Sequence, residues 1–330
     1  MGFSCAFESH LQEMSMGADS SLVSIIIPTH NDRQWVAGAI DCALAQSYPY
    51  CEVIVVDDGS TDGTQGYLHE KYGDRIKYIY KSNSGPASAR NIGVVAASGS
   101  FIQFLDSDDF ISPNKIARQM EVLSENPECD VVYCDFAFTT AGTNVGIEKS
   151  PLAYKEKYGT EKVFEALLDG NFIVIHSPLT RTEVIRSCGA FDESLSSDED
   201  YDLWLKIAAN KHRFCFVPEV LAFYRKRANS VSTNLFKQSN GTLQALNKAK
   251  NYRATLTEQE KENLRRNLSR EYGWTSGHHL SRGDYTRMWS SLRQSIGHNP
   301  RHGLTVAMNL MKWVINELLN KHVLWRFRNK

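Results

Sequence analysis

A chain of 330 residues with 42% apolar residues, 11% aromatic residues and a formal net charge of -1 can hold one large or two modest globular domains. The near-neutral charge argues against a strongly basic nucleic-acid-binding domain, and the apolar content argues against a chain that is disordered throughout. The seven cysteines are scattered without a C-x-x-C pair, so their spacing indicates neither a disulfide framework nor a zinc site, and a reducing compartment is the simplest interpretation.

The first twenty residues are predicted to be a tail. They lack the basic and apolar regions of a secretory signal. The chain also contains no run of 18 uninterrupted apolar residues that would cross a membrane. From these two patterns we expect a cytoplasmic protein.

From residue 21 onward, short apolar runs alternate with segments of helical spacing. The runs predict strands over residues 22–27, 52–58, 76–80 and 101–105. Strands that alternate with helices indicate an α/β fold with a mostly parallel sheet, in which ligands bind outside the carboxyl ends of the strands. Asp57 and Asp58 lie at such an end, as do the aspartates that follow residue 105, so we expect these acids to face one crevice.

The pattern changes after Ser112. A strand is predicted over 130–138, a helix over 199–210, and two short strands around Pro218. Beyond residue 235 only helices are predicted. They begin with a capping box at 257–260, with Asp284 and with Pro300. We therefore expect an α/β domain over 21–235 and a helical region over 236–330.

The segment FIQFLDSDDF (101–110) places Asp106, Asp108 and Asp109 directly after an apolar strand. Carboxylates this close raise one another's pKa unless a positive charge lies between them. Two interpretations remain open for this segment alone. It is either a solvated acidic turn or a site for a divalent cation, which prefers hard oxygen ligands.

Six segments in one order resemble glycosyltransferase family 2, whose members have the GT-A nucleotide-sugar fold. They are VSIIIPTHN, EVIVVDDGSTDGT, ARNIGVVAASG, FLDSDD, GAFDESLSSDEDYDLW and PEVLAFYR, and they cover roughly residues 22 to 230. The resemblance implies a mixed, mostly parallel sheet flanked by helices. It also implies an inverting, metal-dependent enzyme that moves a sugar from a nucleotide donor, expected to be a UDP-sugar, to a glycan or lipid-linked glycan in polysaccharide biosynthesis.

The resemblance assigns a donor site. The D-x-D acids would hold Mn²⁺ or Mg²⁺, with Asp108 or Asp109 as the direct ligand and Asp106 contacting the ribose or the metal through water. Asp58 matches an aspartate that accepts a hydrogen bond from uracil. The segment matching the one that lines the base consists of Pro28, Thr29 and His30. His30 stands where the family has an aromatic residue that stacks on uracil, and the alternative is a structural histidine at the end of the strand.

Two arginines are candidate phosphate ligands. Arg90 is expected to contact either the phosphates or an acidic partner such as Asp106. Arg225 matches the arginine of a Tyr-Arg pair that lies near the pyrophosphate in the family, although the histidine that usually follows is missing here.

Inverting transfer also requires a base, because a sugar hydroxyl is a poor nucleophile at neutral pH. Glu199 and Asp200 match the family's Glu-Asp pair, and Asp200 matches its base. The alternative is that these acids only favour the start of a helix. On the acceptor side, Trp204 is either core or a platform for the acceptor, and His176 either borders the acceptor pocket or is a buried structural histidine.

Residues 301–330 contain six Lys or Arg residues against one acid, with apolar residues at helical spacing. This run is either a peripheral membrane contact or an ordinary packed helix. Two other functions compete with sugar transfer. A sugar-1-phosphate nucleotidyltransferase is expected to carry a Gly-rich basic loop after the first strand, where this chain has PTHNDRQW, and a non-catalytic nucleotide- or carbohydrate-binding module has no need of the SDEDYDLW segment.

Overall fold

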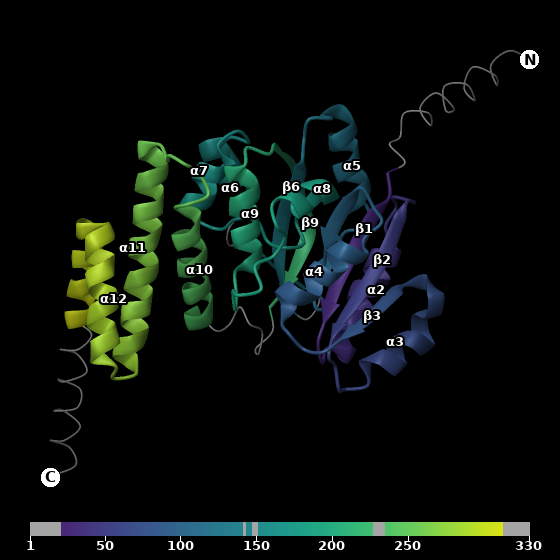
Figure 1. The fold of residues 1–330 in the computed structure, drawn as a ribbon, viewed down its shortest axis with the longest axis horizontal. Helices are drawn as coiled ribbons and strands as arrows, with labels where there is room; N and C mark the ends of the chain where they lie inside the picture. Colours follow the sequence, from purple (N-terminus) through teal and green to yellow (C-terminus); the bar gives the residue numbers. More distant parts are fainter. Residues whose placement is uncertain (1–20, 141–142, 147–150, 227–234, 313–330) are drawn as a thin grey trace, which may run out of the picture. The chain divides into compact units, whose positions relative to one another are not determined.

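The structure is a computed structural model that describes residues 21–140, 143–146, 151–226 and 235–312. These residues form two compact units (Figure 1). The first unit consists of 21–163, 172–193 and 210–226, and the second of 164–171, 194–209 and the residues from 235 onward. The tail over 1–20 lies outside the described residues, and the expected domain boundary after residue 235 remains a prediction.

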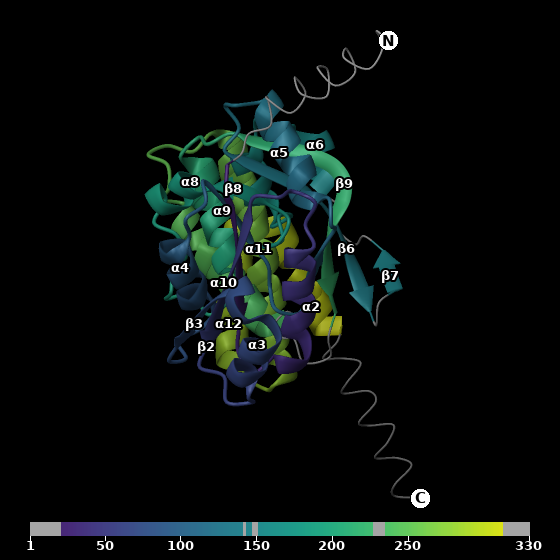
Figure 2. The same cartoon turned by 90° about the vertical axis from the view of Figure 1, so that its right-hand side faces the viewer.

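Nine strands of the described residues form one sheet in the order β3-β2-β1-β4-β8-β6-β9-β5. Strand β7 pairs with β6, beside which it lies in Figure 2. The four strands β1 to β4 pair with one another in parallel, whereas β8 is antiparallel to both β4 and β6. The expected mixed sheet is therefore confirmed. The strands are β1 Val23–Thr29, β2 Cys51–Asp58, β3 Lys77–Lys81, β4 Phe101–Phe104, β5 Phe110–Ile111, β6 Val131–Thr140, β7 Thr143–Gly146, β8 Leu179–Arg181 and β9 Phe214–Arg225.

Helices cover both faces of this sheet. One face of β1 packs in a single apolar cluster with α2, α3 and α5. On the other face α4 lies so close to β1 that a Cβ at Gly93 would stand 2.4 Å from Ile26 Cγ2, which explains the glycine. The helices of the first unit are α2 Arg33–Leu44, α3 Thr64–Tyr72, α4 Pro86–Ala96, α5 Lys115–Glu125, α6 Pro151–Tyr158 and α8 Thr182–Ser187.

The prediction of two short strands around Pro218 is wrong. β9 is one strand, parallel to β6, and its register moves from Cys134↔Val217 to Asp135↔Val220. Pro218 and Glu219 are thus extra residues in a bulge. A bulge accommodates proline within a strand because the residue there does not have to donate to the ladder.

The same pairing explains a disulfide that the cysteine spacing did not indicate. Cys129 precedes β6 and Cys215 lies in β9, and the two are bonded with their Cα atoms 6.2 Å apart. They are 86 residues apart in sequence, so only the juxtaposition of β6 and β9 brings them together.

The second unit is helical, as expected. Helices α10, α11 and α12 lie side by side in Figure 1. The predicted capping box is confirmed: Thr257 and Glu260 each bond to the other's backbone N–H. The helix that follows begins after Asp284, whose side chain accepts a hydrogen bond from the Arg287 N–H. The elements are α7 Val163–Asp169, α9 Glu199–Ala209, α10 Leu235–Ala249, α11 Glu258–Ser281, α12 Tyr285–His298 and a helical stretch over 300–312.

Across the described parts of the chain, no helix combines the length and the apolar character that crossing a bilayer requires.

Candidate active site

The predicted donor-site residues of the first unit gather at one edge of the sheet. β1 and β2 end in register, with Thr29 opposite Asp57, and His30 follows directly. The loop over 105–109 leaves β4, which neighbours β1 on its other side. As in other parallel sheets, this edge is where a ligand would bind.

The two aspartates that end β2 are buried and hydrogen-bonded. Asp58 accepts hydrogen bonds from the Ser84 N–H at 2.9 Å and the Gly85 N–H at 2.7 Å, and it also pairs with Lys81. Asp57 accepts from the Tyr78 hydroxyl at 2.6 Å. Asp58 therefore fixes the loop between β3 and α4, and its contact with uracil remains a prediction.

Of the three residues predicted to line the base, Pro28 and Thr29 are buried in β1 and His30 is exposed. The Asn83 amide nitrogen lies 3.1 Å from His30 Nε2, so the loop after β3 lies beside the imidazole ring. Stacking of this ring on a base remains a prediction.

Arg90 is buried and pairs with Asp106 at 2.6 Å. The alternative of an acidic partner for Arg90 is thereby confirmed. The guanidinium also lies over the Phe191 ring, with 5.5 Å between its carbon and the ring centroid. This pairing orients the first carboxylate of the D-x-D segment.

Asp109 points into the first unit. One of its carboxylate oxygens accepts a hydrogen bond from the Arg225 N–H at 2.7 Å, and the other lies 3.2 Å from His176 Nδ1. His176 is fully buried, and burial lowers the pKa of its imidazole to about 3, so the ring is neutral. This environment favours the buried structural histidine over a residue bordering the acceptor pocket. It also leaves Asp108, which is half-buried, as the better placed metal ligand of the two candidates.

Arg225 lies beside the acidic loop in an arrangement that the sequence did not indicate. Its Nε–H donates to the Asp108 carbonyl at 2.9 Å. Its guanidinium carbon lies 4.5 Å from the centroid of the Trp35 ring and 4.3 Å from that of Phe110. The sequence around Trp35 carries no signal for this contact beyond an aromatic residue near the start of α2.

The donor set at this edge fits a divalent cation in its chemistry. Carboxylates are the hard oxygen ligands that Mg²⁺ and Mn²⁺ prefer, and Mg²⁺ is usually bound by one or two carboxylates with substrate phosphates supplying further oxygens. Within the described ranges, no three His, Cys, Asp or Glu side chains form a metal-binding group by themselves.

The predicted base lies on α9 in the second unit. Asp200 is half-buried, and its carboxylate accepts a hydrogen bond from the Tyr201 N–H at 2.7 Å. Glu199 is buried, and Asp202 pairs with Lys206 at 2.8 Å. Trp204 is fully buried, which favours core over a platform for the acceptor.

Asp198, directly before α9, has an unusual environment. One of its carboxylate oxygens is buried without a hydrogen bond from any described residue. Burial, together with the charges of Asp200 and Glu199, raises the pKa of Asp198 well above the usual 3.8. Its backbone has a φ of 57°, a conformation that asparagine also tolerates.

Asp198→Asn is therefore expected to stabilise the protein. The folded state favours the protonated carboxyl, so the wild type should lose stability as the pH rises from about 4 through the raised pKa. The variant, which carries no charge there, should not show this loss. Thermal melting of both proteins from pH 4 to pH 8 checks the prediction, with Asp202→Asn as a control expected to destabilise because it breaks the pair with Lys206. A wild type that melts higher than Asp198→Asn at pH 8 would contradict it.

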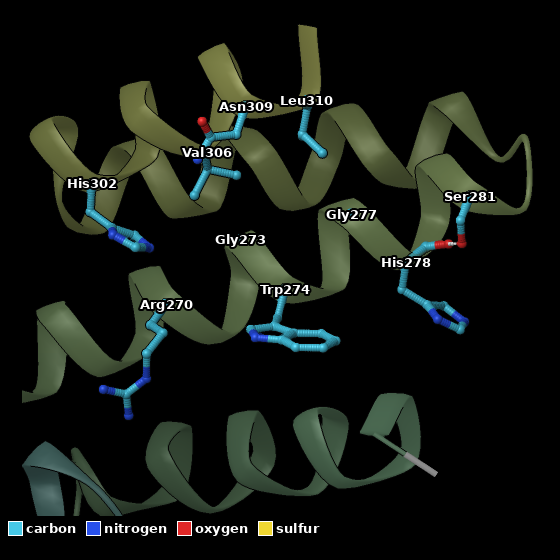
Figure 3. Close-up of a pocket in the computed structure, with 10 residues that line it drawn as sticks. All are labelled: Arg270, Gly273, Trp274, Gly277, His278, Ser281, His302, Val306, Asn309 and Leu310. Carbon is cyan, nitrogen blue, oxygen red and sulfur yellow. Dashed lines mark hydrogen bonds between the residues drawn. The ribbon is translucent and has the colours of Figure 1, made fainter. Parts of the chain in front are cut away.

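A groove of about 520 Å³ lies on the second unit (Figure 3). Helix α11 and the stretch over 300–312 line it, and none of the predicted site residues does. A Cβ at Gly273 would stand 2.8 Å from Val306, so the glycine allows these two helices to pack closely. The lining residues are Arg270, Gly273, Trp274, Gly277, His278, Ser281, His302, Val306, Asn309 and Leu310.

Comparison with known sequences points to one family of enzymes. The sequence profile described as Glycosyl transferase family 2 matches residues 24–187. A putative teichuronic acid biosynthesis glycosyltransferase of Bacillus subtilis is 31% identical over 225 residues, which make up 67% of this chain and 85% of that protein. An uncharacterised glycosyltransferase of Rickettsia typhi is 38% identical over 196 residues. That match covers 58% of this chain and 60% of the length of the Rickettsia protein.

Solved structures are similar in fold. Residues 1–349 of TarS from S. aureus, in complex with UDP-GlcNAc, give a TM-score of 0.65 at 21% identity, covering 86% of this chain and 83% of that one. A mannosyltransferase from Pyrobaculum calidifontis, in complex with GDP-Man and Mn²⁺, gives a TM-score of 0.58 at 16% identity, covering 98% and 92%. These likenesses confirm the expected fold, with its helical region after the sheet.

Proposed function

Because this chain belongs to glycosyl transferase family 2, we propose that it is a metal-dependent inverting glycosyltransferase acting in polysaccharide biosynthesis. Its donor is a nucleotide sugar, for which UDP is the expected nucleotide, and its acceptor is a glycan or a lipid-linked glycan. The polysaccharide context is supported by the name of the Bacillus relative, and the UDP donor by the ligand of the TarS structure.

The observation that carries this proposal is the edge of the sheet where β1, β2 and β4 end. It brings the exposed ring of His30, the buried Asp58 and the D-x-D acids together from three strands. An aromatic ring for a base and carboxylates for a metal are the groups that a nucleoside diphosphate sugar requires. Arg90 and Arg225 place positive charge beside the same acids.

Asp106 and Asp108 are the residues that would hold Mn²⁺ or Mg²⁺. When bound, the metal neutralises the negative charge that grows on the diphosphate as it leaves. Arg90 keeps the Asp106 carboxylate in its orientation through their ion pair. The backbone around Asp108 is held by the Arg225 side chain and by the anchoring of Asp109.

In an inverting enzyme the sugar is transferred in a single displacement at its anomeric carbon. The acceptor hydroxyl oxygen forms the new bond to the anomeric carbon, and the bond from that carbon to the diphosphate breaks with its electron pair leaving on the diphosphate. The hydroxyl proton passes to the Asp200 carboxylate. In the second unit this carboxylate is oriented by the Tyr201 N–H, and Glu199 beside it is buried and does not provide an equally accessible base.

A nucleotide-release assay tests the proposal. The protein is incubated with Mn²⁺ and a panel of UDP- and GDP-sugars, with and without EDTA, and free nucleoside diphosphate is measured. Metal-dependent release from one donor supports the proposal. A nucleotidyltransferase would instead form pyrophosphate from a nucleoside triphosphate and a sugar 1-phosphate, and a binding module would bind nucleotide without turnover.

The proposal includes peripheral contact with the inner face of the cytoplasmic membrane through the basic run over 301–330. Of this run, residues 313–330 lie outside the described residues. Within the described part, the helical stretch exposes Leu304, Met308 and Met311 at helical spacing. Apolar residues on one face, in a segment rich in Lys and Arg, are typical of a helix that lies on an anionic bilayer.

A truncation after Lys312 tests this contact. The cut leaves residues 300–312 in place, because Val306 packs against Gly273 and its removal would uncover α11. We expect the full chain to sediment with phosphatidylglycerol vesicles at low salt. The truncated chain keeps the exposed apolar residues but loses four of the six Lys and Arg residues of the run, so it should sediment markedly less while its donor hydrolysis is retained. Equal sedimentation of both proteins would favour the packed helix.

A further inference from the structure

Two aromatic rings at the acidic edge hold an arginine whose role the sequence left open. Arg225 is the last residue of β9, where it lies opposite Thr139 of β6. Its N–H donates to the Asp109 carboxylate at 2.7 Å, and the next residue, Lys226, donates its N–H to the Thr139 carbonyl at 2.9 Å. The backbone from which the guanidinium extends is thus fixed on both sides.

The side chain of Arg225 is fixed as well. Its guanidinium carbon lies within 4.5 Å of the Trp35 centroid and 4.3 Å of the Phe110 centroid, which are distances at which a cation is attracted to an aromatic face. The Nε–H donates to the Asp108 carbonyl at 2.9 Å. An arginine side chain, which is usually flexible at a protein surface, is therefore held here in one orientation beside Asp108.

The two rings are themselves anchored to the acidic loop. Phe110 directly follows Asp109 and pairs with Phe223 in β9. Trp35 lies in the first turn of α2, and its backbone N–H donates to the Asp32 carbonyl at 2.8 Å. The Asp32 carboxylate in turn accepts a hydrogen bond from the Ser107 hydroxyl at 2.7 Å, which ties the start of α2 to the loop over 105–109.

A structural ion pair does not account for the position of the Arg225 guanidinium. Among the described residues its terminal nitrogens, Nη1 and Nη2, have no hydrogen-bond partner, whereas Arg90 on the other side of the loop pairs with Asp106. A guanidinium that presents its two terminal nitrogens matches the oxygens of a phosphate group.

We propose that Trp35 and Phe110 are positioning residues that hold the Arg225 guanidinium ready to bind the diphosphate of the donor. This assignment rests on the proposed function, because it takes a nucleoside diphosphate sugar as the ligand of this edge. The rings act through Arg225 and do not themselves contact the phosphates. Their contribution is to fix the guanidinium before the donor arrives, so that less side-chain freedom is lost on binding.

A double-mutant cycle on Trp35 and Arg225 tests the assignment, with affinity for UDP in the presence of Mn²⁺ as the readout. Trp35→Leu keeps an apolar side chain but removes the aromatic face, and should weaken UDP binding by about 2- to 30-fold. Arg225→Ala should weaken it by at least about tenfold. Because the ring acts through the guanidinium, the double variant should bind UDP no more weakly than Arg225→Ala alone.

Three further measurements separate positioning from a general structural effect. Trp35→Phe should restore UDP affinity to within about threefold of wild type. Binding of uridine, followed by NMR titration, should be the same in Trp35→Leu as in wild type, because uridine carries no phosphate. Tyr67→Leu is the matched control. It removes an aromatic ring of α3 that lies 5.2 Å from the guanidinium carbon of Arg33, and Arg33 is on the same helix as Trp35. It should leave UDP affinity unchanged.

The outcomes are distinguishable. Independent, additive losses in the double variant would overturn the assignment, as would equal weakening of uridine and UDP in Trp35→Leu. Wild-type UDP affinity in Trp35→Leu would overturn it as well. If the wild-type protein binds neither UDP nor GDP with Mn²⁺, the proposed function itself is wrong, whatever the variants do.

Discussion

Replacing Asp200 by asparagine is expected to lower kcat by about 10²–10⁴-fold while the affinity for UDP stays unchanged. Asparagine keeps the size of the side chain and an oxygen for the Tyr201 N–H, but it cannot take the proton of the acceptor hydroxyl. The loss should therefore fall on the chemical step alone. Steady-state transfer kinetics, combined with calorimetric titration of UDP in Mn²⁺, measure both quantities.

Glu199→Gln is the matched control on the same helix. Glu199 is buried, so its replacement should lower activity less than that of Asp200. A variant at Asp202 is a poorer control, because its carboxylate pairs with Lys206 and accepts a hydrogen bond from Tyr252, and its loss should affect stability. Activity above about a tenth of wild type in Asp200→Asn, with an inactive Glu199→Gln, would show that the wrong carboxylate was assigned.

Replacing Asp108 by alanine is expected to produce the opposite pattern. Removing a metal ligand at the leaving group should lower transfer by about 10²–10³-fold or more, and should also weaken the binding of UDP in Mn²⁺. The wild type should lose its activity in EDTA and regain it when Mn²⁺ is added back. Metal-dependent UDP affinity, measured by titration with and without Mn²⁺, distinguishes this variant from Asp200→Asn.

Asp109→Asn provides the comparison for Asp108→Ala. Asparagine retains an oxygen for the Arg225 N–H, so the anchor should survive in part and Mn²⁺ dependence should remain. If Asp109→Asn abolishes the effect of Mn²⁺ on UDP affinity while Asp108→Ala retains it, then Asp109 is the metal ligand. Wild-type turnover in EDTA would remove the metal from the proposal altogether.

The regular part of the fold could be predicted because its signals are local. The strands that became β1 to β4 coincide with short runs of mainly apolar or aromatic residues, and the capping box at Thr257 fixes a helix start with two residues. Short elements escaped prediction: β5 and β8 have two and three residues, too few to show a period. The continuity of β9 through Pro218 depends on its pairing with β6, which no local pattern contains.

The contacts of the candidate site residues could be predicted only in part. Opposite charges made Asp106 a reasonable partner for Arg90, and the structure confirms the pair. The donors to Asp58 come from a loop more than twenty residues away, and spacing could not identify them. Trp35 could not be identified as a partner of Arg225, because a helical period accounts equally well for a ring that packs inward and one that lies against a guanidinium.

The interleaving of the two units bears on the order in which the chain is completed during translation. Segments 164–171 and 194–209 emerge from the ribosome before the last strand of the sheet, yet they belong with helices that are made after residue 235. The Tyr252 hydroxyl bonds to Asp202, and the Arg253 side chain bonds to the carbonyls of Ala208 and Ala209 at the end of α9. The helix that carries Asp200 must therefore wait for about fifty further residues before its partners exist. A nascent chain that stops at the end of β9 would have completed its sheet and the proposed donor edge, but not the support of the helix that carries the proposed base.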